Sequence, residues 1–301
     1  MSVIVENITK IYGEQKAVNN ISFEVHSGEI VGFLGPNGAG KSTTMKILSC
    51  FIPQTSGKAK VCGFDTEKNS IEVRRNVGYL PEHNPLYPEM YVKEYLEFAA
   101  GLNGMKGAQK RIEEMIELTG LTVERKKKIG QLSKGYRQRV GLAQAMLHDP
   151  KVLIMDEPTS GLDPNQLTDV RKLIKMLGKE KTVILSTHIM QEVEAICDRV
   201  IIINKGELVA DDSVANIREQ RKGITIVTVE FKEPIDKYLL SQLKGIKNVS
   251  GDIKLIIEYE GDDDIREKLF QFAVDNKYTL LNLNIQKQSL EDVFKEVTKK
   301  K

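Results

Sequence analysis

The chain has 301 residues, of which 41% are hydrophobic and 29% charged, with a net charge of +2. This length allows a well-buried core and about two domains. The charge lacks the clustered positive excess that binding to a nucleic-acid backbone needs. No apolar run approaches the roughly 18–20 residues that cross a bilayer, and the start, MSVIVENITK, lacks the apolar core of a signal peptide. Three widely separated cysteines, Cys50, Cys62 and Cys197, suit a reducing compartment. We therefore expect a cytoplasmic protein without nucleic acid as a partner.

Up to about residue 215, strand patterns alternate with helical patterns, which is typical of an α/β fold with much of the sheet parallel. SVIVENI and NNISFEV alternate in hydrophobicity, whereas EIVGFL (29–34) is continuously apolar, as in a strand buried on both faces. Further strands are predicted at 57–65, 151–157, 182–187 and 199–204. Helices are predicted in KSTTMKILSCF and over 92–118 and 134–147. The apolar faces expected within 92–118 consist of Tyr95, Phe98, Ala99 and Leu102, and later of Ile112, Met115 and Ile116.

The pattern changes after about residue 220. ITIVTVEF (224–231) predicts a strand, 236–244 a helix, IKNVSGDIKLIIEYE two strands, 263–276 a helix and YTLLNLNI a strand. This β-α-β-β-α-β order is the split ferredoxin-like unit. A closing helix is predicted from Ser289, with acidic residues in its first turn. We place the boundary in the charged stretch NIREQRKG, which divides the chain into domains at 1–220 and 221–301.

GPNGAGKS (35–42) matches the phosphate-binding pattern G-x-x-x-x-G-K-[ST], with a predicted buried strand before it and a helix after it. The glycines allow the backbone to curl so that its amides point at a β-phosphate, and the helix adds its positive end. Lys41 supplies a charge for the β- and γ-phosphates, and Ser42 offers an oxygen to Mg²⁺. A chance match to four fixed positions has a probability of roughly 1% in a chain of this length. The pattern therefore predicts a nucleotide site.

An acidic pair ends the apolar strand VLIMDE. Asp156 can order the Mg²⁺ shell, and Glu157 can accept a proton from an attacking water, a role that contributes ~10²–10⁴-fold to rate. The alternative is an acidic pair that caps a helix. His188 follows TVILST and is predicted to contact a γ-phosphate, although a lone histidine at a helix start is often structural.

The order of these motifs resembles the ATP-binding subunits of ABC transporters. GPNGAGKST resembles their Walker A motif, LSKGY (132–136) their signature, VLIMDEPTSGLD their Walker B motif with its D-loop, and THI their His-switch. The likeness covers residues 2 to about 215. It implies a P-loop NTPase core of the ABC type with antiparallel β and helical subdomains, the latter at about 90–147, followed by a small α+β ferredoxin-like domain.

The resemblance implies ATP and Mg²⁺ as cofactors and a shared site. Tyr12 would stack on adenine. The phosphates would be held by Gly35, Pro36, Asn37, Gly38, Ala39, Gly40, Lys41, Ser42 and Thr43. Two subunits would pack head to tail around two ATP molecules, so that Ser133 and the amide of Gly135 reach the γ-phosphate bound to the other copy. Asp163 would couple the two sites. Separate membrane-spanning permease subunits would hold the protein at the inner face of the cell membrane.

The sequence departs from the family pattern at two places. In the signature, usually LSGGQ, Lys134 and Tyr136 replace Gly and Gln, whereas Ser133 and Gly135 are retained. Glu82 stands where the family commonly has a Gln that touches Mg²⁺ and lines up water. Glu82 can still bind the metal and joins Glu157 and His188 as a predicted catalytic residue, but it adds negative charge near the triphosphate. The stretch HNPLYPEMY that follows is where relatives receive a helix of the membrane subunit; a plain surface loop is the alternative.

The C-terminal unit, which closes in SLEDVFKEVT (289–298), resembles the appended domain of a subgroup that serves drug and lipid export and bacterial gliding. This likeness predicts an exporter. A soluble ABC-type ATPase acting on ribosomes or DNA usually carries two cassettes or long coiled coils, and the chain has one cassette and no such heptads. A GTPase would need N-K-x-D, but NKGE ends in Glu207. A regulatory cassette without hydrolysis stays open because of Glu82.

Overall fold

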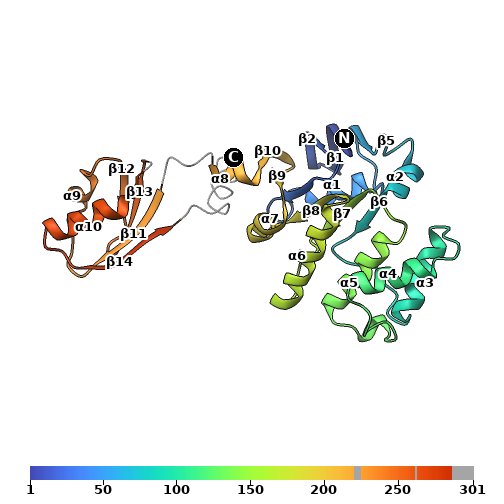
Figure 1. The fold of residues 1–301 in the computed structure, drawn as a ribbon. Helices are drawn as coiled ribbons and strands as arrows, with labels where there is room; N and C mark the ends of the chain where they lie inside the picture. The colour runs from blue at the N-terminus through green and yellow to red at the C-terminus, as the bar shows by residue number, and fades with distance from the viewer. Residues whose placement is uncertain (220–224, 262, 287–301) are drawn as a thin grey trace. The chain divides into compact units, whose positions relative to one another are not determined.

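The computed structural model describes residues 1–219, 225–261 and 263–286 (Figure 1). Contacts divide the chain into two compact units, Met1–Val214 and Ala215–Lys301. Within the described ranges, no helix combines the length and the hydrophobicity of a membrane-spanning segment.

A six-stranded sheet with the order β10-β9-β3-β8-β7-β6 forms the centre of the first unit. Neighbouring strands are parallel except β10, which is antiparallel to β9. Every residue of β3, β7 and β8 is buried, which explains their continuous apolar runs. The carboxyl ends of these three strands therefore meet at one edge of the sheet. The strands are β3 (Ile30–Leu34), β6 (Val77–Leu80), β7 (Val152–Asp156), β8 (Thr182–Thr187), β9 (Arg199–Asn204) and β10 (Glu207–Ser213).

A second, antiparallel sheet has the order β2-β1-β4-β5. Its strands are β1 (Val3–Tyr12), β2 (Gln15–Val25), β4 (Ser56–Val61) and β5 (Phe64–Asp65). One hydrophobic cluster joins both sheets to helix α1 (Lys41–Leu48), for example through Val5, Phe33 and Met45. The sheets thus fix the direction of α1, and with it the position of the glycine-rich loop that precedes α1.

Helices complete the first unit (Figure 1). They are α2 (Ser70–Asn76), α3 (Val92–Leu102), α4 (Gln109–Leu118), α5 (Lys134–Met146), α6 (Pro164–Gly178) and α7 (Met190–Ile196), together with the short 3₁₀ helix η1 (Ile129–Gln131). The helices α3, α4 and α5 pack on one another. A further helix, α8 (Val214–Glu219), follows β10. The sequence analysis did not predict α2, β6, β10 or α8.

The predicted helix over 92–118 is two helices. Residue Asn103 ends α3, and Gly104, with a φ of 68°, turns the chain away. The predicted face of α3 is partly wrong, because Leu102 is 74% exposed and Phe98 is also exposed. The buried stripe of α3 is Val92, Tyr95, Leu96, Ala99 and Ala100, since α3 packs against two helices rather than one. In α4, the predicted face of Ile112, Met115 and Ile116 is confirmed.

The second unit has the predicted β-α-β-β-α-β order. After α8, most of which belongs to this unit, it contains β11 (Thr225–Phe231), α9 (Lys237–Ser241), β12 (Ile246–Ser250), β13 (Lys254–Tyr259), α10 (Ile265–Asp275) and β14 (Leu280–Gln286). The sheet order is β12-β13-β11-β14, with antiparallel neighbours. One face carries the core, in which Val229 and Ile257 pack with Leu269 of α10. The helix predicted from Ser289 lies outside the described residues.

Candidate functional site

The loop between β3 and α1 depends on glycines at points of close approach. A Cβ atom at Gly35 would lie 2.4 Å from the carbonyl oxygen of Ile203, and one at Gly40 would lie 2.4 Å from that of Ala17. Gly40 also has a φ of 109°, in the left-handed region, where it caps α1. Larger residues at these two positions would displace the loop. The curled backbone at the start of a helix fits a phosphate group.

Lys41, the first residue of α1, is a buried cation next to this loop, with 6% of its surface exposed. Its Nζ donates hydrogen bonds to the carbonyl oxygens of Gly35 (2.7 Å) and Pro36 (3.2 Å) and lies 3.8 Å from Oε1 of Glu157. Burial lowers the pKa of Lys41, and the nearby carboxylates of Glu157, Asp156 and Glu82 oppose this shift. The ammonium group is therefore held where a phosphate oxygen can replace the loop carbonyls.

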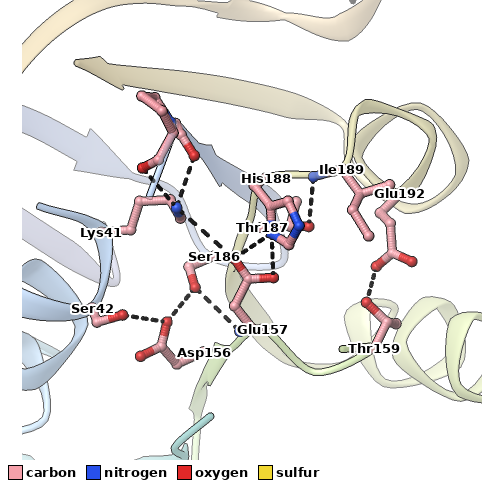
Figure 2. Close-up of polar contacts among 12 residues, drawn as sticks. Lys41, Ser42, Asp156, Glu157, Thr159, Ser186, Thr187, His188, Ile189 and Glu192 are labelled. Atoms are coloured by element: carbon pink, nitrogen blue, oxygen red, sulfur yellow. Dashed lines mark hydrogen bonds and ion pairs between the residues drawn. The ribbon is translucent and has the colours of Figure 1, made fainter. Parts of the chain in front are cut away.

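Asp156, at the end of β7, is buried and accepts hydrogen bonds from two hydroxyl groups (Figure 2). The Ser42 hydroxyl donates to its Oδ1 at 3.0 Å, and the Ser186 hydroxyl donates to the same oxygen. Carboxylate and hydroxyl oxygens are ligands that suit Mg²⁺, which usually completes its shell with waters and phosphate oxygens. The pair Ser42 and Asp156 therefore fits one corner of a magnesium–nucleotide site.

Glu157 has a conformation that few non-glycine residues adopt, with a φ of 51°. Its amide is held in place because it donates to the carbonyl oxygen (3.1 Å) and to Oγ (3.2 Å) of Ser186. Both carboxylate oxygens lie 3.0 Å from Nδ1 of His188. Burial raises the pKa of Glu157, and the contact with His188 opposes this shift. A carboxylate with a raised pKa is a better proton acceptor than an ordinary one.

These groups face a cavity of about 570 Å³. It is lined by Tyr12, Gln15, Ala17, Asn37, Gly38, Gly40, Lys41, Ser42, Thr43, Glu82, Glu157, Ser160 and His188. Gly35, Pro36 and Ala39 belong to the same loop but do not line the cavity. Asp156 lines an adjoining cavity of about 420 Å³, which shares Ser42 and Glu82 with the first one. The fold thus gathers most of the predicted site residues from strands and loops that are far apart in the chain.

Tyr12 and Glu82 are two of the exposed residues in this lining. The ammonium group of Lys10 lies over the ring of Tyr12 in a cation–π contact, 5.2 Å from the ring centroid. The face of Tyr12 is therefore already occupied by a cation, which a flat base would have to share or displace.

Three predicted site residues, Ser133, Gly135 and Asp163, do not line the cavity. Ser133 caps α5, and its Oγ accepts a hydrogen bond from the amide of Tyr136 at 3.4 Å. Asp163 caps α6 and accepts hydrogen bonds from the amides of its first turn. The side chain of Gln166 covers Gly135, because a Cβ atom there would lie 2.0 Å from Oε1 of Gln166. These residues form a separate group at the starts of α5 and α6.

The sequence analysis missed four residues of this site. Ser186 holds both Asp156 and the amide of Glu157, and its polar character at the end of an apolar strand is a signal that could have identified it. Gln15 and Ala17 reach the cavity through the pairing of β2 with β1, and Ser160 lies in the loop after Glu157. No motif marks Gln15 or Ala17, whereas Ser160 lies within the quoted stretch VLIMDEPTSGLD.

Comparisons with known proteins agree with this geometry. The sequence model described as ABC transporter matches residues 18–160. The linearmycin resistance ATP-binding protein LnrL of Bacillus subtilis (strain 168) is 34% identical over 97% of both chains. The chain belongs to the ABC transporter family. The bacitracin transport ATP-binding protein BcrA of Bacillus licheniformis is 35% identical to this ABC protein. The alignment covers 98% of this ABC protein and 97% of BcrA.

Solved structures extend the likeness to the fold. The ATP-binding cassette MJ0796, a dimer in a post-hydrolysis state bound to ADP and Pi, is 29% identical with a TM-score of 0.65, over 70% of this chain and 98% of MJ0796. A second structure, of an ATP-binding subunit of an ABC transporter, has a TM-score of 0.67 at 29% identity, over 73% and 93% of the two chains. The predicted P-loop NTPase fold is confirmed. This ABC protein is an ATP-binding transporter subunit and an ATPase, with ATP and Mg²⁺ as its cofactors.

Proposed function

We propose that this ABC protein is the hydrolytic subunit of an exporter, that two copies close head to tail around two MgATP, and that they drive separate permease subunits. The observation that carries this proposal is the incomplete cavity. Ser133, Gly135 and Asp163 do not line it, although Ser133 is exposed at the start of α5. Each copy then supplies half of each site.

Within one copy, the loop amides and Lys41 bind the β- and γ-phosphates, and Tyr12 contacts adenine. Ser42 and Asp156 would hold Mg²⁺, which neutralises charge on the phosphates. Glu157 accepts the proton of the attacking water, because its carboxylate faces the cavity and has a raised pKa. His188 keeps that carboxylate in place and contacts the γ-phosphate, and Glu82 assists at the metal.

The second copy contributes the hydroxyl of Ser133, the amide of Gly135 and the positive end of α5, a helix of 13 residues. The side chain of Gln166 lies where a Cβ atom of Gly135 would be, so only glycine fits at this position beside α6. Asp163, at the start of α6, would couple the two sites. The dimeric structure of MJ0796 supports this arrangement by likeness.

Export is supported by the names of similar proteins, which include the linearmycin resistance protein and a Nod factor export ATP-binding protein I of Burkholderia orbicola. The likeness to the subgroup of drug, lipid and gliding systems rests on the C-terminal unit. The boundary between the ATP-binding domain and this C-terminal unit lies at about residue 220, and the C-terminal unit has an accessory or regulatory role. The stretch HNPLYPEMY would receive a permease segment; its residues His83, Asn84 and Pro85 line the adjoining 420 Å³ cavity together with Phe51, which is 71% exposed. The protein would then work in the cytoplasm, on the inner face of the membrane.

The proposal is tested with Glu157→Gln. The amide cannot accept a proton, so hydrolysis should fall by about 10²–10⁴-fold while ATP still binds. The uncleaved ATP should hold two copies together, which light scattering after size exclusion at saturating MgATP measures as a dimer. A variant that hydrolyses ATP at the original rate, or that stays monomeric, contradicts the proposal.

A second substitution in the Glu157→Gln background tests the shared site. Ser133→Glu would place a negative charge against the γ-phosphate of the other copy, so the protein should remain monomeric while each copy still binds ATP. Ser241→Glu, on α9 in the second unit, is the matched control and should leave the dimer intact. Equal dimer formation by both double variants would exclude Ser133 from the interface.

A further inference from the structure

A buried carboxylate connects the two loops that carry Glu157 and His188. Glu192 is on α7, four residues after His188, and none of its surface is exposed (0%). One carboxylate oxygen accepts a hydrogen bond from the hydroxyl of Thr159, which is itself 2% exposed and lies two residues after Glu157 (Figure 2). The other oxygen lies 3.3 Å from Nη2 of Arg171 on α6. A carboxylate this deeply buried is costly unless it is hydrogen-bonded and paired.

Thr159 holds the far end of the turn that contains Glu157. The carbonyl oxygen of Glu157 accepts a hydrogen bond from the amide of Ser160 at 3.2 Å, and that of Thr159 accepts one from Leu162 at 3.3 Å. Ser186 fixes the near end through the amide of Glu157. The turn is therefore held at both ends, and the strained φ of Glu157 lies between them.

Glu192 holds the loop of His188 in the same way. The amide of Glu192 donates to the carbonyl oxygen of Ile189 at 3.2 Å, and the amide of Ile189 donates to the hydroxyl of Thr187 at 3.1 Å. His188 lies between Thr187 and Ile189, which this hydrogen bond holds together. A bond from Glu192 to Thr159 thus fixes the distance between the two loops behind the cavity.

We propose that Glu192, acting through Thr159, is a positioning residue that keeps Glu157 in register with His188. The inference rests on the roles proposed above for those two residues. Neither Thr159 nor Glu192 lines the nucleotide cavity, so the contact should affect the rate of hydrolysis and not the affinity for ATP. A displacement of about 1 Å in a catalytic group can cost on the order of 10²-fold in rate.

The test is the pair Thr159→Val and Thr159→Ser in the full chain. Valine keeps the shape of threonine but removes the hydroxyl, so kcat should fall about tenfold while the dissociation constant of ATP changes less than about twofold. Serine restores the hydroxyl and should recover kcat to within about twofold of the original protein. Steady-state kinetics and titration calorimetry supply the two readouts.

Thr119→Val is the matched control. Thr119 is also fully buried (0% exposed), and its hydroxyl donates to the carbonyl oxygen of Met115 at 2.7 Å, at the end of α4. It should leave kcat unchanged, whatever its effect on the melting temperature. The inference is overturned if Thr159→Val retains full kcat, if Thr159→Ser fails to restore it, or if Thr119→Val lowers it equally. If the proposed function itself is wrong, the Glu157→Gln variant should hydrolyse ATP at the original rate, which is a different result from the three above.

Discussion

The two units of this ABC protein differ in how deeply their charged side chains are buried. At the carboxyl edge of the six-stranded sheet, Lys41, Asp156 and Glu157 are buried close together. In the second unit, pairs such as Lys237 and Asp252, 2.7 Å apart, lie at the surface. Exposed pairs contribute about 0–1 kcal/mol, whereas buried charges lower stability unless a partner compensates them. The buried group is therefore best explained by a charged ligand, and the surface pairs need no such explanation.

The strand arrangement produces this difference. In the first unit, β3, β7 and β8 are parallel and buried on both faces, so their following loops meet at one edge. In the second unit, β13 alternates, with Leu255 and Ile257 buried and Lys254 and Ile256 exposed. Its antiparallel neighbours send successive loops to opposite ends of the sheet. The first arrangement concentrates polar groups, and the second disperses them.

The sharpest test of this contrast is Lys41→Met. A hydrogen bond to a charged group contributes about 1.5–3 kcal/mol, so the affinity for ATP should fall about 10–100-fold, as measured by titration calorimetry. Lys268→Met is the matched change in the second unit, where Lys268 pairs with Asp263 at 2.6 Å. It should leave ATP affinity within about twofold. If both variants weaken binding equally, the contrast between buried and surface charges is wrong.

A smaller effect is expected for Tyr12→Ala. Stacking of a base on an aromatic ring is worth at least about 1 kcal/mol, so the affinity for ATP should fall roughly fivefold or more. Tyr12→Phe keeps the ring and should bind nearly as well. Tyr238→Ala removes an exposed ring from α9 in the second unit and should have no effect. Unchanged affinity in Tyr12→Ala would remove adenine stacking from the proposed site.

Much of the fold and of the site could be predicted from sequence, because local rules determine those parts. The continuous run before Gly35 predicts a buried strand, and Gly40 is needed where the loop backbone is crowded. Asp156 ends one apolar strand and His188 follows another, so their approach at one sheet edge follows from a parallel sheet. The alternation after residue 224 likewise predicts the order of strands and helices in the second unit.

The remainder depends on tertiary contacts that no local pattern encodes. Thr159 and Glu192 are 33 residues apart in sequence and meet because α7 packs against β3, β8 and α6. Leu102 is exposed because the neighbours of α3 select a different stripe. The strand β6 has four residues, too few for a reliable periodicity. The covering of Gly135 by Gln166 is also invisible in the motif LSKGY.

The smallest effect is predicted for a chain that ends at residue 222. All residues that line the nucleotide cavity come from positions up to His188. Among the described residues, the hydrophobic cluster of the second unit lies between Val227 and Ile285, and that of the first contains none beyond Leu208. Removing 223–301 should therefore leave the dissociation constant of ATP, measured by calorimetry, within about twofold, because the residues that line the cavity and those of the first cluster all precede the cut. A folded truncated chain whose affinity for ATP drops tenfold would show that the second unit helps to form the nucleotide site. The contrast between a first unit that gathers the polar groups of the site and a second unit that contributes none would then be wrong.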